Sequence, residues 1–270
     1  MLRVVTLNTW KCDGEYGPRL ALMSRELARL DADVLCLQEC FAVCADDDAC
    51  MDGVHRIADT GKTLAEALGM RLFHAPAREK QRTANGDRVR STSGLVLLLR
   101  SQMAVGVAEV LDLLLDPRDG DRIAQSVTVR LPGAPALRIV NLHLTHLRDR
   151  DDLRPLQLDA VLARWDPTDV PVLLAGDFNA TFDSAPLSAL RDRTDLDIGP
   201  VSPERWPTTM MLGPSSRAID HVLLLRGAHD STLRIQDRRR VLDCADSTGL
   251  FPSDHAGVLV ELEMRRSVDV

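Results

Sequence analysis

The chain alternates short apolar runs with stretches in which apolar residues recur every three or four positions. Runs typical of buried strands lie at residues 2–7, 33–38, 94–99, 104–110, 123–131, 137–142, 170–174, 219–225 and 257–262. Helical spacing appears at residues 19–30, 63–68 and 152–165. Because many strands occupy the middle of the chain and helices lie near both ends, this pattern predicts layered sheets flanked by helices.

The helical stretches have recognisable boundaries. Pro18 suits the first turn of the helix expected over residues 19–30. Gly69 is expected to end the helix over residues 63–68. In the third helix, Arg154 and Gln157 lie three positions apart on one face, and we expect both to have a structural role.

Two long segments have neither a strand-like apolar run nor helical spacing and are predicted to be loops: residues 41–52 and residues 76–92. The first is acidic and rich in cysteine, and the second carries the basic residues Arg78, Lys80, Arg82, Arg88 and Arg90. Loops of this length in a compact domain are commonly functional. A separate basic run, Arg238-Arg239-Arg240, is predicted to be a solvated strand end.

Polar residues follow many of the apolar runs. They are Asn8, Glu39, His143, Asp177, Asn179, Asp220 and the sequence Ser253-Asp254-His255. Each has an ordinary explanation as a turn former, a cap or a solvated charge. Their number and repeated position nevertheless predict that they meet at one rim of the sheets, where carboxylates, amides and imidazoles form a site for a hard metal ion.

Composition narrows the class of protein. The 270 residues have no Pro/Gly/Ser-rich linker, and the polar residues above run from position 8 to 255, so we expect a single domain over residues 1–270. The net charge of −7 does not favour a nucleic-acid partner, although it leaves room for a local basic groove. With no apolar leader and no run long enough to span a bilayer, a cytoplasmic protein is expected. Oligomeric state stays open.

Cys40, Cys44 and Cys50 form a cluster with spacings of four and six. Tight zinc sites need a second pair of cysteines or histidines, which is missing here. Free thiols in a reducing compartment are therefore the expectation, with a loop disulfide and a zinc site as the alternatives.

Taken together, the motifs resemble the endonuclease/exonuclease/phosphatase superfamily of DNase I-like metal-dependent phosphohydrolases. They are Leu7-Asn8-Thr9-Trp10, Leu37-Gln38-Glu39, Ser93-Gly94-Leu95, Asn141-Leu142-His143-Leu144, Gly176-Asp177-Phe178-Asn179, Ile219-Asp220-His221-Val222 and Ser253-Asp254-His255. The resemblance spans nearly the whole chain and implies an α+β fold. The implied architecture is a four-layer α/β/β/α sandwich, with two mostly antiparallel sheets flanked by helices.

The resemblance also implies a division of roles in an in-line attack of water on phosphorus. Mg²⁺ or Mn²⁺ would be held by Glu39 and Asn8, with help from Asp254. His255, oriented by Asp220, would accept a proton from the attacking water. Asp177 and Asn179 would orient the nucleophile and the phosphate, and His143 would contact a phosphate oxygen or assist the leaving group.

This chain departs from some relatives at two positions. Some nucleases of the superfamily have an acidic residue two positions after the first Asn, where this chain has Trp10. Abasic-site nucleases lack a histidine at the place of His143. His146 lies three positions from His143, so on a continuous strand the two imidazoles would face opposite sides and could not chelate together. His221 is expected to face away from Asp220 for the same reason.

Three functions fit these observations. The acidic balance and the scarcity of aromatic residues favour a metal-dependent phosphoesterase acting on a small-molecule or lipid-headgroup phosphodiester. A Mg²⁺-dependent DNA or RNA endonuclease that uses the basic loop is the alternative. A non-catalytic binding module on the same scaffold is disfavoured by the complete set of polar residues. The resemblance places substrate selection in residues 41–52, 76–92 and 201–214.

Overall fold

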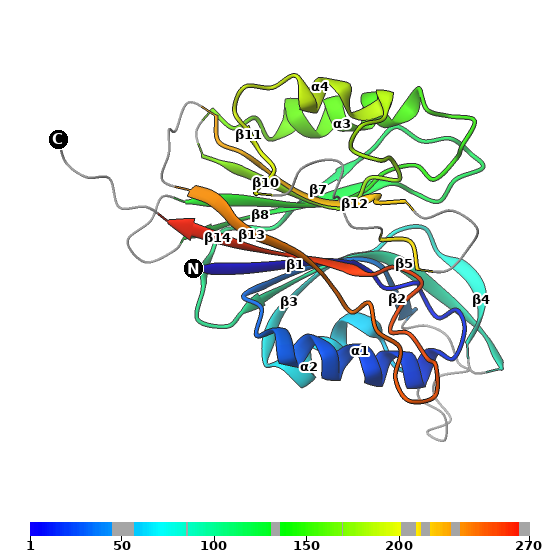
Figure 1. Ribbon diagram of the computed structural model, residues 1–270. Helices are drawn as coiled ribbons and strands as arrows, with labels where there is room; N and C mark the ends of the chain where they lie inside the picture. Colours follow the sequence, from blue (N-terminus) through cyan, green and yellow to red (C-terminus); the bar gives the residue numbers. More distant parts are fainter. Residues whose placement is uncertain are drawn as a thin grey trace.

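Two seven-stranded sheets pack face to face in the computed structural model, with helices on both outer faces (Figure 1). The structure describes residues 1–44, 57–84, 86–130, 136–168, 170–200, 209–211, 217–227 and 233–264. The four layers confirm the predicted α/β/β/α sandwich. Within the described ranges, no helix has the length and apolar character needed to cross a bilayer.

The first sheet has the strand order β13-β14-β1-β2-β5-β3, with β4 also paired to β5. Its strands are β1 (Leu2–Asn8), β2 (Val34–Val43), β3 (Met70–Ala75), β4 (Lys80–Ala84), β5 (Asp87–Arg100), β13 (Leu233–Val241) and β14 (Gly257–Met264). Only β1 and β2 pair in parallel. Helices α1 (Tyr16–Leu30) and α2 (Thr60–Leu68) cover its outer face (Figure 1).

The second sheet has the order β11-β12-β10-β9-β8-β6, with β7 also paired to β8. Its strands are β6 (Ala104–Val105), β7 (Glu109–Asp112), β8 (Ile123–Arg130), β9 (Leu137–His143), β10 (Val172–Asp177), β11 (Leu196–Asp197) and β12 (Asp220–Leu225). Here β9 and β10 are the parallel pair. The outer face carries α3 (Leu153–Arg164), a short 3-10 helix η2 (Ala185–Leu187) and α4 (Ser188–Arg191) (Figure 1).

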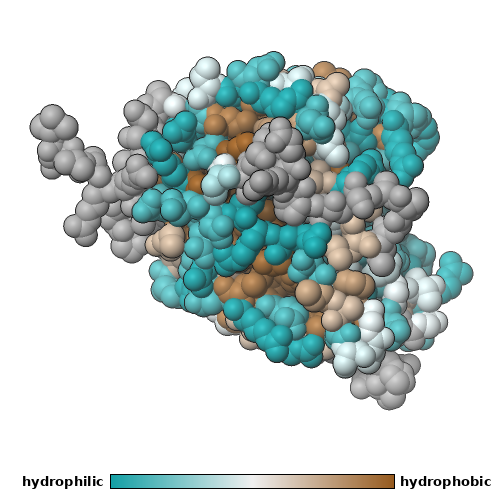
Figure 2. Space-filling view, viewed as in Figure 1, coloured by the Kyte–Doolittle hydropathy of each residue, from teal (hydrophilic) through white to brown (hydrophobic). Residues whose placement is uncertain are grey.

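The alternation of side chains explains why both sheets are apolar on two faces. In β1, Val4 faces the other sheet, whereas Val5 and Leu7 face α1. Strands covered on both sides read as continuous apolar runs, which is the pattern seen in the sequence. On the face shown in Figure 2, hydrophilic residues dominate the surface, and apolar residues show in smaller areas between them.

A buried polar contact joins the two sheets below the predicted site. The Gln38 side chain donates to Oδ1 of Asn141 over 2.7 Å. Asn141 in turn donates to the carbonyl oxygens of Leu37 and Val96, at 3.0 and 3.1 Å. Buried amides are costly unless hydrogen-bonded, so this contact fixes how the sheets face each other.

Several sequence predictions were wrong in detail. The predicted loop over residues 76–92 is irregular only before Lys80, because β4 and the first part of β5 pair over Lys80↔Ser91 to Ala84↔Asp87 as a hairpin. The predicted loop 41–52 begins inside β2, which continues to Val43. The expected strand over 104–110 is split into β6 and β7. The strands β3 and β11 were not predicted, and of β13 only a strand end at residues 238–240 was.

Arg238 corrects the prediction of a solvated basic run. Its side chain is buried and donates to the carbonyl oxygens of Ile198 and Val222. Arg154 and Gln157 do have the expected structural role, since both are buried and hydrogen-bond to the backbone of Thr145.

The cysteines of the described ranges are free thiols: Cys12, Cys36, Cys40, Cys44 and Cys244. Cys50 and most of residues 201–214 lie outside the described residues. The alternatives of a disulfide or zinc site that includes Cys50 therefore stay predictions.

Candidate active site

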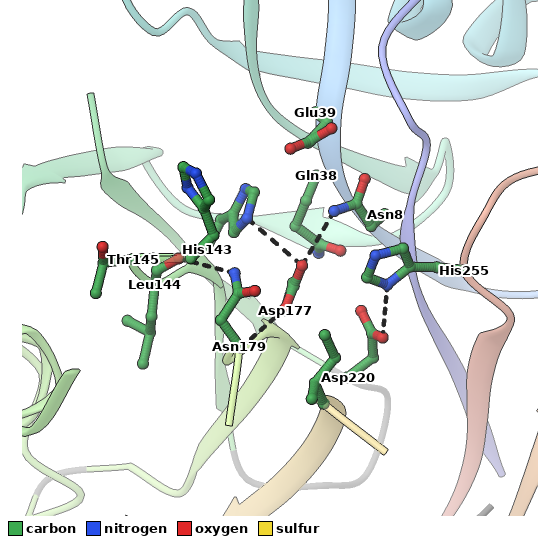
Figure 3. A network of polar contacts seen from close by, with 12 residues as sticks. Asn8, Gln38, Glu39, His143, Leu144, Thr145, Asp177, Asn179, Asp220 and His255 are labelled. Carbon is green, nitrogen blue, oxygen red and sulfur yellow. Dashed lines mark hydrogen bonds and ion pairs between the residues drawn. The ribbon is translucent and has the colours of Figure 1, made fainter. Parts of the chain in front are cut away.

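Strand register brings the predicted polar residues to one rim of the sandwich. Asp177, at the end of β10, pairs in register with His143 on β9 and with Asp220 on β12. Asn8, at the end of β1 in the other sheet, donates from Nδ2 to Oδ2 of Asp177 over 3.0 Å. The rim therefore draws on both sheets, and Asp177 lies at its centre (Figure 3).

Asp177 is almost fully buried and is held from several sides. Its Oδ1 accepts from the backbone N–H of Asn179 over 2.8 Å, and Nε2 of His143 lies 3.5 Å from its Oδ2. Burial and the negative charge of Asp220 raise the pKa of Asp177 well above the ordinary value. A cation close to this carboxylate would stabilise its ionised form.

The residue before Asp177 must be glycine. Gly176 has a φ of +154°, and a Cβ at this position would lie 2.0 Å from the carbonyl oxygen of Leu142. This close approach lets β9 and β10 end side by side. Asn179 has a φ of +51°, a left-handed conformation that Asn adopts more readily than most residues. Its Nδ2 donates to the carbonyl oxygen of Leu144.

His255 and Asp220 form a buried pair between the two sheets. Nδ1 of His255, two residues before β14, lies 2.8 Å from Oδ2 of Asp220, at the start of β12. Burial opposes protonation of His255. The charges of Asp220, Asp177 and Asp254 outweigh burial and raise the pKa of the imidazole to about 10. The pair therefore has a strong tendency to hold a proton.

Glu39 lies at a bulge in β2. The pairing with β5 shifts between Leu37 and Cys40, and Glu39 has a φ of +54°, which is uncommon for a residue other than glycine. Bulges commonly redirect a side chain next to a functional site. Here Oε2 of Glu39 lies 3.0 Å from the ammonium of Lys11.

Burial is the main reason for a raised pKa at Asp254, and the negative charge of Glu39 adds to it. Glu39 and Asp254 thus act on each other as like charges at this end of the site. Such an arrangement favours a bound cation.

A single buried guanidinium organises the segment that follows Asn8 and the segment that leads to Asp254. Arg19 on α1 is 2% exposed and stacks on the ring of Trp10 at 4.7 Å from the ring centre. It donates to five backbone carbonyl oxygens, those of Thr9, Trp10, Lys11, Asp13 and Pro252. The segment after β1 and the segment before His255 are thereby tied to the same side chain.

These residues open into a cavity of about 320 Å³. Seven of the eight predicted site residues line it: Asn8, Glu39, His143, Asp177, Asn179, Asp254 and His255. The eighth, Asp220, is fully buried and reaches the cavity through His255. His221 faces away from Asp220 as expected and packs against Phe178.

The prediction for His143 and His146 rested on a wrong premise. β9 ends at His143, so the two residues do not alternate along one strand, and both line the cavity. Burial lowers the pKa of His143 well below the ordinary value, and the positive charge of Arg122 adds to this. His143 is therefore neutral at physiological pH.

Sequence reasoning missed a buried ion pair in the cavity wall. Arg122 donates to Oδ1 of Asp119 over 2.6 Å, and the other oxygen of Asp119 accepts from the Thr145 hydroxyl. Nδ1 of His146 lies 2.9 Å from the same carboxylate. Arg122 stands directly before the apolar run of β8, a charge at a strand end that could have drawn attention.

Some of these groups could hold a metal ion. One ligand atom each from Asp177, Asp220 and His255 lies within 4.8 Å of the others, and all three residues are buried. Glu39, one of the expected metal ligands, is not part of this compact group; in Figure 3 it stands apart from Asp220 and His255. The oxygen donors that line the cavity suit a hard divalent ion.

Comparison with known proteins gives one family match and many similar folds. The family model described as Endonuclease/Exonuclease/phosphatase family matches residues 5–255. No curated protein matches this chain.

Among solved structures, TDP2 from D. rerio, complexed with a single-strand DNA product, has a TM-score of 0.69 at 18% identity, covering 97% of this chain and 99% of that one. The human Nocturnin catalytic domain with bound sulfate has a TM-score of 0.69 at 16% identity, covering 98% and 93%. An endonuclease/exonuclease/phosphatase from Beutenbergia cavernae has a TM-score of 0.68 at 22% identity, covering 97% and 71%. At these identities, the likeness concerns the fold.

Proposed function

The chain belongs to the endonuclease/exonuclease/phosphatase family, and we propose that it hydrolyses a small-molecule or lipid-headgroup phosphodiester with the aid of a divalent metal ion. Membership of this family makes it a hydrolase of phosphoric esters. The observation that carries the proposed chemistry is the buried pair of His255 and Asp220, 2.8 Å apart, beside Asp177 at the cavity. That the protein works in the cytoplasm stays a prediction.

The proposed metal is Mg²⁺ or Mn²⁺, held by Glu39, Asn8 and Asp254. The donor set fits, because all three offer oxygen atoms at the same cavity. Oδ1 of Asn8 accepts one hydrogen bond, from the backbone N–H of Trp10, and retains a second lone pair. The ammonium of Lys11 already lies beside Glu39, which indicates that this carboxylate favours a cation. When bound, such an ion withdraws charge from the phosphate and from the leaving oxygen.

His255 is the proposed general base. Its Nδ1 is engaged by Asp220, which fixes the ring orientation and leaves Nε2 to accept a proton from water. The three carboxylates that raise the pKa of His255 also stabilise the imidazolium that this step forms. To begin the step, His255 must be neutral, and positive charge bound in the cavity favours that state.

The remaining site residues are proposed to position the attacking water, the phosphate and the leaving group. Asp177, fixed by Asn8 and the backbone of Asn179, is proposed to orient the attacking water. The side-chain oxygen of Asn179 is proposed to orient the water and phosphate as well, because its Nδ2 is engaged by Leu144. His143, which is neutral, is proposed to donate a hydrogen bond to a phosphate oxygen or to the leaving group.

A nucleic-acid endonuclease is the second candidate. In its favour, Lys80 and Arg82 on β4 and Arg78 just before β4 lie in the cavity wall. Against single-strand binding, Trp10 is the only Phe, Tyr or Trp among the described residues of that wall, and its ring is stacked on Arg19. Grooves for single strands usually stack several bases on aromatic rings. A small phosphodiester therefore remains the better fit.

Hydrolysis of bis(p-nitrophenyl) phosphate tests the proposal, with supercoiled plasmid assayed in parallel. We expect release of p-nitrophenol with Mg²⁺ or Mn²⁺, its loss in EDTA and no catalytic nicking. Efficient nicking at low salt would favour the nuclease. Absence of turnover on both would count against a phosphodiesterase.

Isothermal titration with Mn²⁺ tests the metal ligands without relying on turnover. Glu39→Gln should weaken binding by at least about tenfold. The matched control is Asp112→Asn, which removes an exposed carboxylate of β7 that does not line the cavity. Equal Mn²⁺ affinity in the wild type, Glu39→Gln and Asp112→Asn would show that Glu39 is not a metal ligand.

A further inference from the structure

The cavity is polarised between an acidic end and a basic wall. Six lysine and arginine residues line it: Lys11, Arg78, Lys80, Arg82, Arg122 and Arg217. Three are paired with carboxylates, Lys11 with Glu39 at 3.0 Å, Arg78 with Asp121 at 2.7 Å, and Arg122 with Asp119 at 2.6 Å. In the part of the chain that the structure describes, no carboxylate pairs with the other three. We call Lys80, Arg82 and Arg217 the cationic wall.

Arg82 is held in place by neutral partners. One guanidinium nitrogen donates to the carbonyl oxygen and the hydroxyl of Ser91, at 2.8 and 3.0 Å, and another donates to the Ser93 hydroxyl at 2.8 Å. These hydrogen bonds fix the side chain without cancelling its charge. An anion that binds to Arg82 therefore meets a group that has already lost much of its freedom.

Lys80 reinforces the charge of Arg82 from the same strand. The two residues are two positions apart on β4, so their side chains point to the same face. The Lys80 ammonium lies close to Gly120: a Cβ added to this glycine would be 3.9 Å from Nζ of Lys80. Lys80 therefore lies against the loop that carries Asp119 and Asp121.

Arg217 adds the third charge from another part of the chain. It lines the cavity with Met210 and Ile219, and its Nε makes no hydrogen bond to any described residue. Residues from separate segments thus supply positive charge that nothing in the described wall neutralises.

The single negative charge of a phosphodiester does not account for this wall. The scissile phosphate belongs beside Asp177 and His255, whereas Lys80 and Arg82 of the cationic wall lie on the β4–β5 hairpin, at another part of the cavity lining. We infer that the cationic wall binds a second phosphate group of the substrate, so that the enzyme prefers phosphodiesters carrying a further phosphate. This inference rests on the proposed function and narrows its substrate class.

Two matched substrates test the inference: thymidine 5′-(p-nitrophenyl phosphate), and the same ester with an added 3′-phosphate. The wild type should hydrolyse the second with kcat/KM about tenfold higher or more, mainly through a lower KM, because hydrogen bonds between charged groups are strong. Lys80→Gln, Arg82→Gln and the double variant should lose this preference and retain kcat on the first ester.

Arg88→Gln is the matched control. It removes an exposed arginine from the same hairpin, outside the cavity wall, and should keep the preference. Lys80 is exposed, so its variant does not threaten folding. Equal kcat/KM on the two esters in the wild type, or an undiminished preference in the double variant, would overturn the inference while leaving the proposed function intact.

Equilibrium binding decides the inference even if neither ester is hydrolysed, a result that would count against the proposed function alone. By titration calorimetry in EDTA, thymidine 3′,5′-bisphosphate should bind the wild type at least about tenfold more tightly than thymidine 5′-monophosphate. The double variant should abolish the difference. If the double variant keeps the difference in affinity between the two nucleotides, or if the wild type shows no such difference, the cationic wall binds no second phosphate.

A short thymidine oligonucleotide distinguishes the source of the second phosphate. If it competes more strongly than the bisphosphate and loses this advantage in the double variant, the wall serves a polynucleotide backbone. Equal or weaker competition supports a small bisphosphorylated substrate. Either result agrees with a phosphate group bound at the cationic wall.

Discussion

His255 and Asp220 lie 2.8 Å apart although β14, which follows His255, and β12, which Asp220 begins, belong to different sheets of the sandwich. The pair therefore forms only when the two sheets face each other correctly, a relation that the buried contact between Gln38 and Asn141 helps to fix. The proposed proton transfer therefore depends on the packing of the two sheets.

Replacing His255 with alanine should slow hydrolysis of bis(p-nitrophenyl) phosphate by about 10²–10⁴-fold, the usual share of a general base. Initial rates with saturating Mg²⁺ measure the effect. His74→Ala removes an exposed histidine of β3 outside the cavity and should leave the rate unchanged. A rate near that of the wild type in His255→Ala would exclude the proposed role.

Arg19→Met should weaken Mn²⁺ binding by about 10–100-fold, because Arg19 ties the segment directly after Asn8 to the segment directly before Asp254. Arg19→Lys should recover part of the loss. Calorimetric affinity and thermal unfolding are measured together, with Arg25→Met, an exposed change on the same helix, as the control. Lowered thermal stability with unchanged affinity would indicate a purely structural role.

Gly176→Ala should lower the free energy of unfolding by more than about 2 kcal/mol, since its Cβ overlaps the Leu142 carbonyl at a φ of +154°. Gly17→Ala is the matched control. Gly17 lies in α1, and a Cβ added there would have no neighbouring atom within 4 Å. That change should stabilise by up to about 1 kcal/mol. Urea unfolding compares the two, and similar stabilities would contradict the close approach of β9 and β10.

His221 makes the stability depend on pH. Burial lowers its pKa from 6.5 to about 4. As the pH falls from about 6.5 toward 4, the unfolded chain takes up a proton at this site and the folded protein does not. Stability therefore decreases through that window and is fully present above it. Between pH 7 and 5, urea unfolding in EDTA should show the wild type losing about 2 kcal/mol more than His221→Gln. Parallel losses would show that His221 does not titrate differently on folding.

Much of the site could be predicted from the sequence because the end of an apolar run marks the end of a strand. An apolar run such as residues 171–176 must be buried, so the Asp177 that follows it lies at a rim. The same reasoning placed Asn8, His143 and Asp220, and all of them meet there. The roles of these residues, and a single domain over 1–270, stay predictions.

Where the prediction failed, the cause was a partner distant in sequence. Arg238 looked solvated because nothing near it in the chain shows that the Ile198 and Val222 carbonyls would receive it. The hairpin of β4 and β5 looked like a loop, since its polar residues carry no apolar period. His143 and His146 appeared to oppose each other only while β9 was assumed to continue.

By itself, the sequence determined most of the buried strands, the three longer helices and the polar residues at the strand ends, because burial of apolar side chains depends on local periodicity. Only the tertiary structure decided which charges are neutralised. Lys11, Arg78 and Arg122 have carboxylate partners in the cavity, whereas Lys80, Arg82 and Arg217 have none among the described residues. Electrostatic pairing depends on distances between side chains that the fold brings together, and no pattern along the chain contains them.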